Sequence, residues 1–99
     1  MKFQVPPCDV CGGRLKPNVV FFGDSVDRCL VEDLYRKVES SDGFLVCGSF
    51  LYVGSGYRFV RHARVNQVRI FIINIGETRA DSICNFKIQS SISQKLNQI

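Results

Sequence analysis

Three short apolar runs constrain the fold of this chain more than any other feature of its sequence. Each run is continuous rather than alternating, is rich in β-branched or aromatic residues, and ends at or near a glycine. Runs of this kind are typical of strands buried on both faces, as in a parallel sheet. The runs are Val19–Phe22, Phe44–Cys47 and Ile70–Ile73, and the glycines are Gly23, Gly48 and Gly76.

Two amphipathic segments separate the three runs. Asp27–Glu39 has apolar residues at helical spacing, with Asp27 as its expected N-cap, and Tyr57–Asn66 carries a second apolar stripe. The expected order is therefore β-α-β-α-β, which indicates an α/β fold with an open parallel sheet and right-handed crossovers. The sequence ends with a short apolar run, Phe86–Ile88, and an amphipathic tail that contains Ile92, Leu96 and Ile99.

Composition argues against several classes of protein. The chain has 99 residues, the size of one small domain, with 13 Lys and Arg against 9 Asp and Glu. Its net charge of +4 is mild for a dedicated nucleic-acid binder, so we expect no nucleic-acid partner. We expect no membrane span and no targeting segment, because no long apolar stretch or transit-peptide pattern is visible. Five cysteines, an odd number, indicate a reducing compartment.

Ligands of open α/β sheets bind beyond the carboxyl ends of the strands. That rule singles out three loops, Gly23–Ser25, Gly48–Phe50 and Asn74–Gly76, which are rich in small residues and contain the polar side chains of Ser49 and Asn74. The stretch Gly48–Gly56 also precedes a helix, whose free amides suit a phosphate or a nucleotide. Nucleotide binding and a simple role of these glycines in strand-to-helix turns both remain open from spacing alone.

Cys8 and Cys11 form a C-x-x-C pair followed by two glycines, which is one half of a zinc knuckle. A structural zinc site needs four ligands, so we expect two further ligands from outside this chain. A redox pair is the alternative, but that role normally needs a helix start directly after a strand. His62 is expected to be a solvated residue within a helix, and nearby arginines form either a solvated face or a partner site. No complete active site is visible.

The order of these motifs resembles the sirtuin family, and within it the mitochondrial class II branch. The similarity covers about residues 5–99, including the whole C-x-x-C-G-G segment and the stretch from Leu15 to Asp24 that follows it. Gly48-Ser49-Phe50-Leu51-x-Val53 resembles the sirtuin Gly-Ser/Thr-Ser-Leu-x-Val loop. Ile73-Asn74-Ile75-Gly76-x-Thr78-Arg79-x-Asp81 resembles the later nucleotide loop of the family.

The resemblance implies an NAD-dependent protein-lysine deacylase; some members also transfer ADP-ribose. Residues 1–16 would be a remnant of the zinc module, and residues 17–99 the C-terminal half of a Rossmann-like NAD-binding domain. Acylated-lysine proteins would be the partners, NAD and zinc the cofactors, and the mitochondrial matrix the location. The implied site residues are Cys8 and Cys11 for zinc, Val20, Phe21 and Gly23 for the acyl-lysine peptide, and Gly48, Ser49, Phe50, Asn74, Ile75, Gly76 and Ile92 for NAD.

Several family motifs are missing from the chain, among them the Gly-rich entry loop, the Gln-Asn-x-Asp segment, the catalytic His and the first zinc pair. We therefore assign no catalytic residue and expect the 99-residue chain alone to be inactive. Phe50 stands where the family has a small polar Ser, so it either weakens a cofactor contact or turns inward to pack against Phe22 or Leu51. The alternatives to the enzyme are a non-catalytic interaction module and a nucleotide-binding remnant.

Overall fold

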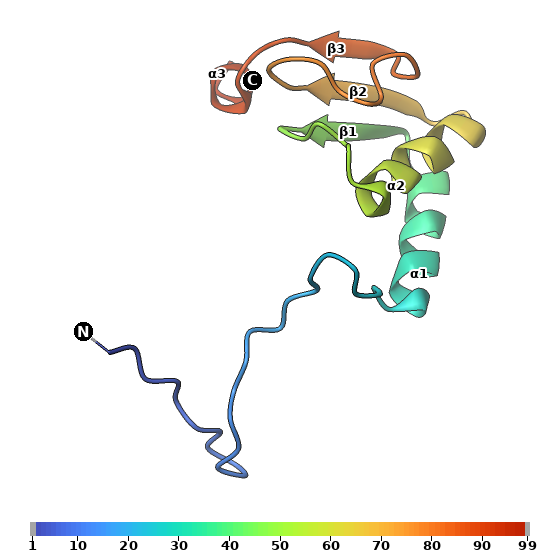
Figure 1. Ribbon diagram of the computed structural model, residues 1–99. Coiled ribbons are helices and arrows are strands. Elements are labelled where there is room, and N and C mark those ends of the chain that lie inside the picture. The colour runs from blue at the N-terminus through green and yellow to red at the C-terminus, as the bar shows by residue number, and fades with distance from the viewer. Residues whose placement is uncertain (1, 99) are drawn as a thin grey trace.

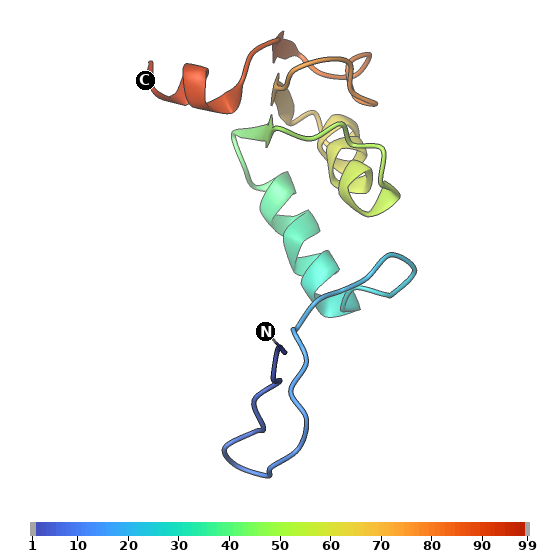
Figure 2. The same cartoon turned by 60° about the vertical axis from the view of Figure 1, so that its left-hand side comes forward.

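The computed structural model describes residues 2–98, and its helices and strands form one small α/β unit (Figure 1). An extended N-terminal segment precedes the first helix and reaches away from this unit (Figure 2). The elements in chain order are α1 (Arg28–Glu39), β1 (Gly43–Cys47), α2 (Gly54–Val65), β2 (Arg69–Ile73), β3 (Phe86–Ile88) and α3 (Ile92–Leu96).

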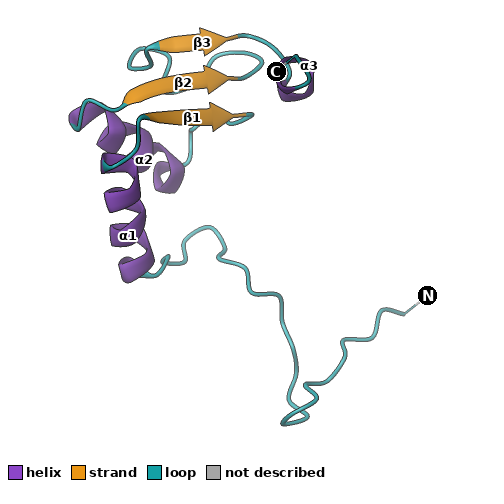
Figure 3. Cartoon of the chain, turned by 180° about the vertical axis from the view of Figure 1, so that it is seen from behind, coloured by secondary structure: helices purple, strands orange, loops and turns teal. Residues whose placement is uncertain are grey.

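The three strands form a parallel sheet in the order β1-β2-β3. In its register Cys47 pairs with Ile73, and Ile73 pairs with Ile88. All three strands therefore end at the same edge, and α3 lies just beyond that edge (Figure 3). The prediction of an α/β fold with a parallel sheet is confirmed.

Helix α1 forms where the sequence predicted it. The Asp27 carboxylate caps its start by accepting hydrogen bonds from the backbone N–H groups of Cys29 and Leu30, at 2.7 and 3.2 Å. Arg36 and Lys37 lie in the last turn, where a cation is favourable beside the negative end of the helix dipole. The helix buries Val31 and Val38 toward the rest of the molecule.

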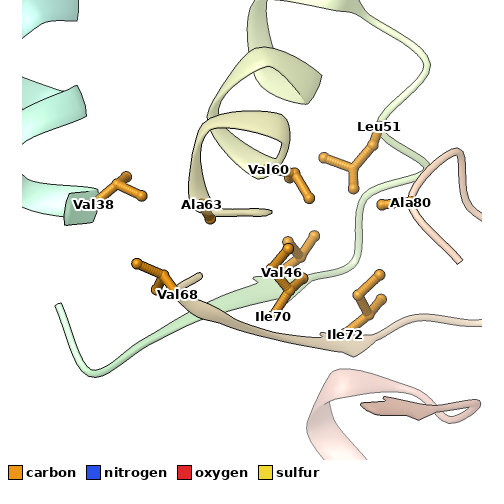
Figure 4. Close-up of a cluster of buried hydrophobic side chains, with 9 residues drawn as sticks. All are labelled: Val38, Val46, Leu51, Val60, Ala63, Val68, Ile70, Ile72 and Ala80. Atoms are coloured by element: carbon orange, nitrogen blue, oxygen red, sulfur yellow. The ribbon is translucent and has the colours of Figure 1, made fainter. Parts of the chain in front are cut away.

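The core lies between α2 and one face of the sheet (Figure 4). Val60 and Ala63 of α2 are completely buried against the sheet residues Ile70 and Ile72, with Val46 beside them. Burying a side chain of this size contributes roughly 1.5–3 kcal/mol. The α2 stripe predicted from the sequence is therefore the contact that holds this helix to the sheet.

The first predicted strand is wrong. Val19–Phe22 belongs to no sheet and ends in a turn at Phe22, and its side chains are exposed, that of Phe22 to 91 %. A strand needs a neighbour for its backbone N–H and C=O groups, and no described strand lies beside this run. The segment between β2 and β3 contains turns, and the observed order begins with a helix and ends β-β-α.

Strand β1 is buried on one face only, which corrects the expectation of burial on both. Val46 faces the core, whereas Leu45 is 55 % exposed and Cys47 is also exposed. Both long helices pack on the Val46 side, so the opposite side of this strand has no cover among residues 2–98. The tail helix α3 includes Ile92 and Leu96, and Ile99 lies outside the described residues. No described helix is long and apolar enough to cross a membrane.

Candidate functional site

A cavity of about 430 Å³ lies at the edge of the sheet where the strands end. It collects residues from three separate parts of the chain: the loop after β1, the loop after β2, and the segment that begins α3. Most of the residues expected to contact NAD line this cavity. Ser49 and Gly76 are the two expected residues that do not. The lining residues are Gly48, Phe50, Asn74, Ile75, Ser90, Ser91, Ile92 and Ser93.

Gly48 and Ile92 meet directly at this cavity. Gly48 has a φ of +62°, a left-handed conformation that glycine adopts far more readily than other residues. A Cβ built on it would lie 2.6 Å from Cδ1 of Ile92. Its N–H donates to the carbonyl oxygen of Ile73 at 2.9 Å, which extends the ladder between β1 and β2 past the strand end. Position 48 therefore requires glycine both for its backbone and for its neighbour.

Asn74 shapes the second loop of the cavity. It is only 4 % exposed, its N–H donates to the carbonyl oxygen of Ile88 at 3.1 Å, and its side-chain amide donates to that of Ile75 at 3.0 Å. The Asn74 side-chain amide, which we expected to contact a ligand, thus stabilises the loop backbone. Ile75, by contrast, is 63 % exposed and presents apolar surface to the cavity.

Phe50 forms part of the cavity wall and not of the core. Its side chain is half exposed, and its ring stacks on Tyr52 with the centroids 6.1 Å apart. A Cβ on Gly76 would lie 3.6 Å from the Phe50 ring, so these two loops touch. Phe50 therefore does not turn inward. The neighbouring Ser49 hydroxyl accepts from the N–H of Leu51 at 3.2 Å, which stabilises the loop turn.

Leu51 is a strained residue that the sequence does not reveal. Its φ is +59°, in the left-handed region that is costly for a side chain of this kind, and yet it is 8 % exposed in the core. Strained backbone of this kind costs about 1–3 kcal/mol and persists only where the surroundings impose it. Here the burial of the leucine side chain holds the loop that carries Ser49 and Phe50.

A polar cluster ties the Gly76 loop to β3. The Lys87 ammonium donates to the carbonyl oxygen of Gly76 at 2.7 Å and pairs with the Asp81 carboxylate at 2.6 Å. The Thr78 hydroxyl donates to the other Asp81 oxygen. The hydrogen bond from Lys87, followed by that from Thr78, holds the pKa of Asp81 below its usual range. The N–H of Arg79 also donates to the carbonyl oxygen of Phe50 at 3.0 Å.

Sequence reasoning missed the three serines of the cavity. Ser91 is the N-cap of α3, and its hydroxyl accepts from the N–H of Gln94 at 3.3 Å. The other two, Ser90 and Ser93, flank it on the same wall. The signal that could have revealed them is a serine directly before an amphipathic stretch, which is a typical helix start.

A second hollow, of about 360 Å³, contains the residues expected to contact the peptide. Val20, Phe21 and Gly23 line it together with Val53 and Ser55 from the start of α2. A turn shapes it: the N–H of Asp24 donates to the carbonyl oxygen of Phe21 at 3.0 Å, and Gly23 has a φ of +92°. The structure thus brings these three residues to a surface beside α2.

Cys8 and Cys11 lie in a tight turn of the extended segment. The N–H of Gly12 donates to the carbonyl oxygen of Cys8 at 2.8 Å, and the N–H of Cys8 donates to that of Gly13 at 2.9 Å. The backbone N–H of Cys11, and then that of Val10, lowers the pKa of the Cys8 thiol. This arrangement fits one edge of a metal site. No cluster of three or more metal-ligating side chains is found within residues 2–98.

His62 joins two helices and is not simply solvated. Its Nε2 lies 2.7 Å from Oε1 of Glu39, and its ring stacks on Tyr35 with the centroids 4.3 Å apart. Only 25 % of its side chain is exposed. It lines neither of the two hollows described above, so it takes no part in the candidate site.

Comparison with known proteins decides the family. The sequence model of the Sir2 family matches residues 1–55. The chain belongs to the Sir2 family. It is 50 % identical over 94 residues to an NAD-dependent protein deacetylase of Xanthomonas axonopodis pv. citri, covering 95 % of this chain and 32 % of that protein. It is 47 % identical to human NAD-dependent protein lipoamidase sirtuin-4, mitochondrial, over 95 % of this chain and 30 % of that protein.

Solved Sir2 structures share the fold. A Sir2 structure with a p53 peptide and NAD+ superposes with a TM-score of 0.82 at 26 % identity, over 95 % of this chain and 39 % of that one. A Sir2 structure bound to an acetylated peptide gives a TM-score of 0.83 at 26 % identity, with 95 % and 40 % covered. The present Sir2 chain thus spans about a third of the curated relatives that it matches.

Proposed function

We propose that this Sir2 chain supplies NAD-contacting loops to an NAD-dependent protein-lysine deacylase. The observation that carries the proposal is the cavity at the carboxyl edge of the sheet, where three distant segments of the chain converge. Ligands of open α/β sheets bind at this edge. The names of the relatives, which include an NAD-dependent deacetylase and an NAD-dependent lipoamidase, support the same activity.

The residues present fit a dinucleotide. The cavity volume of about 430 Å³ lies within the roughly 300–1,000 Å³ of small-molecule sites. We assign the ribose and phosphate side to Gly48, Ser49 and Phe50, where a glycine without a Cβ lets a ligand approach the backbone. We assign the adenosine side to the Asn74–Gly76 loop and to Ile92. When bound, NAD would supply the ribose carbon that the acyl oxygen of the lysine attacks as nicotinamide leaves.

The peptide side of the reaction belongs to the second hollow. Val20, Phe21 and Gly23 would line the acyl-lysine channel, because all three line this hollow and the backbone of their segment pairs with no described strand. An extended substrate peptide can add to such a segment by strand pairing. Acylated-lysine proteins are therefore the proposed partners.

The C-x-x-C turn would hold zinc as one half of a structural site. Cys8 and Cys11 would supply two thiolate ligands, and the site would need two further ligands from another part of the enzyme. Zinc there would stabilise the turn and take no part in the reaction. The proposed division of the chain follows: residues 1–16 belong to the zinc module and residues 17–99 to the NAD-binding domain.

We propose the mitochondrion as the location, by similarity to the human and cattle sirtuin-4 proteins, which are 47 % and 48 % identical to this chain. The Xanthomonas relative is as similar at 50 %, so sequence identity does not choose between them. Fractionation of the source cells followed by immunodetection tests the proposal. Detection in the cytosol alone would contradict it.

A chimera tests the enzymatic proposal. The chain would replace its matching 94 residues in the Xanthomonas relative, and nicotinamide release from acyl-lysine peptides would be measured with and without NAD. We expect NAD-dependent turnover. The 99-residue chain alone should give none, because removal of a general base typically costs about 10²–10⁴-fold in rate and no base is assigned in this chain. A folded chimera that binds no NAD would contradict the proposal.

A further inference from the structure

We propose that the groove between α1 and α2 is a docking site for an acidic segment of a partner protein. The groove has a volume of about 460 Å³ and shares no lining residue with the proposed NAD cavity. This docking site therefore does not depend on the proposed deacylase activity. The groove is lined by Tyr35, Arg58, Arg61, His62, Val65 and Asn66.

The charge of the groove comes from α2. This helix carries three arginines and no acidic residue. Within residues 2–98, neither Arg58 nor Arg61 forms an ion pair. Arg58 donates from Nε to the carbonyl oxygen of Ser55 at 3.1 Å and lies over the Phe59 ring, which holds the guanidinium in place. A guanidinium held this way can bind a carboxylate through two parallel hydrogen bonds.

The walls of the groove are connected to each other. The contact of His62 with Glu39 at 2.7 Å joins α2 to α1. The Tyr35 ring stacks on His62 and packs at a tilt against Phe59. These contacts join the two helices, which lie next to each other in Figure 1 and Figure 3. His62 already donates to Glu39. Arg58 and Arg61 are therefore the groove residues whose positive charge is left to receive an acidic ligand.

The groove fits a protein segment better than a free anion. Beside the arginines it presents apolar surface, the Tyr35 ring and Val65, and Val65 is 78 % exposed at its end. A lone phosphate would use only the arginines and leave this surface bare. A peptide with apolar residues next to its carboxylates would cover both. The partner segment is thus expected to be acidic and partly apolar.

A fluorescein-labelled hexapeptide of four glutamates and two leucines is the probe, and its anisotropy with the 99-residue chain is the measurement. We expect binding that weakens as salt rises. The double variant Arg58→Gln/Arg61→Gln should weaken binding about two- to thirtyfold, the range for two exposed charge pairs. The matched variant Arg64→Gln/Arg69→Gln changes the net charge equally but lies outside the groove, so it should change binding less than about twofold.

A variant of opposite sign sharpens the test. Glu39→Gln removes a carboxylate that contacts the groove residue His62, so it should strengthen binding of an acidic peptide, whereas a merely structural role predicts no gain. Equal losses in the two double variants would overturn the proposal by showing a non-specific charge effect. Displacement of the peptide by equimolar inorganic phosphate would replace the protein partner with a small anion. If circular dichroism shows that the groove variant is unfolded, Arg61→Gln alone decides, since Arg61 is exposed.

Discussion

One added carbon at Gly48 tests the geometry of the proposed NAD cavity. Gly48→Ala introduces two separate costs. The left-handed backbone, with φ at +62°, costs an L-residue about 1–2 kcal/mol. The new Cβ would also lie 2.6 Å from Cδ1 of Ile92, and moving that side chain off its rotamer costs about 0.5–1.5 kcal/mol. We expect the free energy of unfolding to fall by about 2–3 kcal/mol.

A double-mutant cycle separates these two costs. Ile92→Ala removes the atom that the new Cβ would meet, so in that background only the backbone cost remains. Gly48→Ala should then cost about 1–2 kcal/mol, and the coupling energy should be about 1 kcal/mol. Urea denaturation of the 99-residue chain, followed by circular dichroism, measures all four free energies.

Gly54→Ala is the matched control. Gly54 begins α2, and a Cβ built there meets no atom within 4 Å. Alanine is the better helix former by about 1 kcal/mol, so this change should be neutral or stabilising. In the chimera, Gly48→Ala should also raise the dissociation constant for NAD about tenfold, or about 1.4 kcal/mol, while Gly54→Ala should leave it unchanged.

Two results would refute this reasoning. An equal cost of Gly48→Ala in both backgrounds would mean that Gly48 and Ile92 do not touch in solution. No cost in the Ile92→Ala background would mean that the backbone at position 48 is not left-handed. In the first case the cavity would lack the wall that Ile92 of α3 provides, and in the second the loop after β1 would have another backbone conformation.

Three further predictions concern other parts of the site. Because the pKa of Asp81 is lowered in the folded state, its stabilisation is present in full above the unfolded pKa of about 3.9 and is lost as the pH falls through the folded value. Urea midpoints from pH 2 to 7 should lose this component in Asp81→Asn and keep it in the surface control Asp33→Asn; identical profiles would count against the Lys87 contact. Cobalt titration should give weak thiolate absorption that Cys11→Ser abolishes and Cys29→Ser does not, and one tightly held zinc per monomer would show a third ligand. In the chimera, Phe50→Ser should tighten NAD binding about tenfold by restoring a hydroxyl that hydrogen-bonds the cofactor. Unchanged affinity would mean that Phe50 has not replaced a hydrogen bond to NAD.

The helices and two main strands could be predicted because their signals are local. The Asp27 cap and the apolar stripe of α2 depend only on neighbours within a few turns, and both are present as expected. Val19–Phe22 could not be assigned correctly, because an apolar run becomes a strand only when another strand lies beside it. The prediction that His62 is solvated was wrong for a related reason, because its partner Glu39 lies 23 residues earlier, on a different helix.

The convergence of the candidate site follows from the register of the parallel sheet. Cys47, Ile73 and Ile88 pair across the sheet, so the residues that follow them leave the strands at one level. The N–H groups of Gly48 and Asn74 extend this alignment by donating to the carbonyl oxygens of Ile73 and Ile88. The strand assignments alone therefore brought these loops together. Two contacts close the cavity, Phe50 over Gly76 and Ile92 against Gly48. They depend on side-chain rotamers and on a left-handed backbone, and neither can be predicted from the periodicity of the sequence.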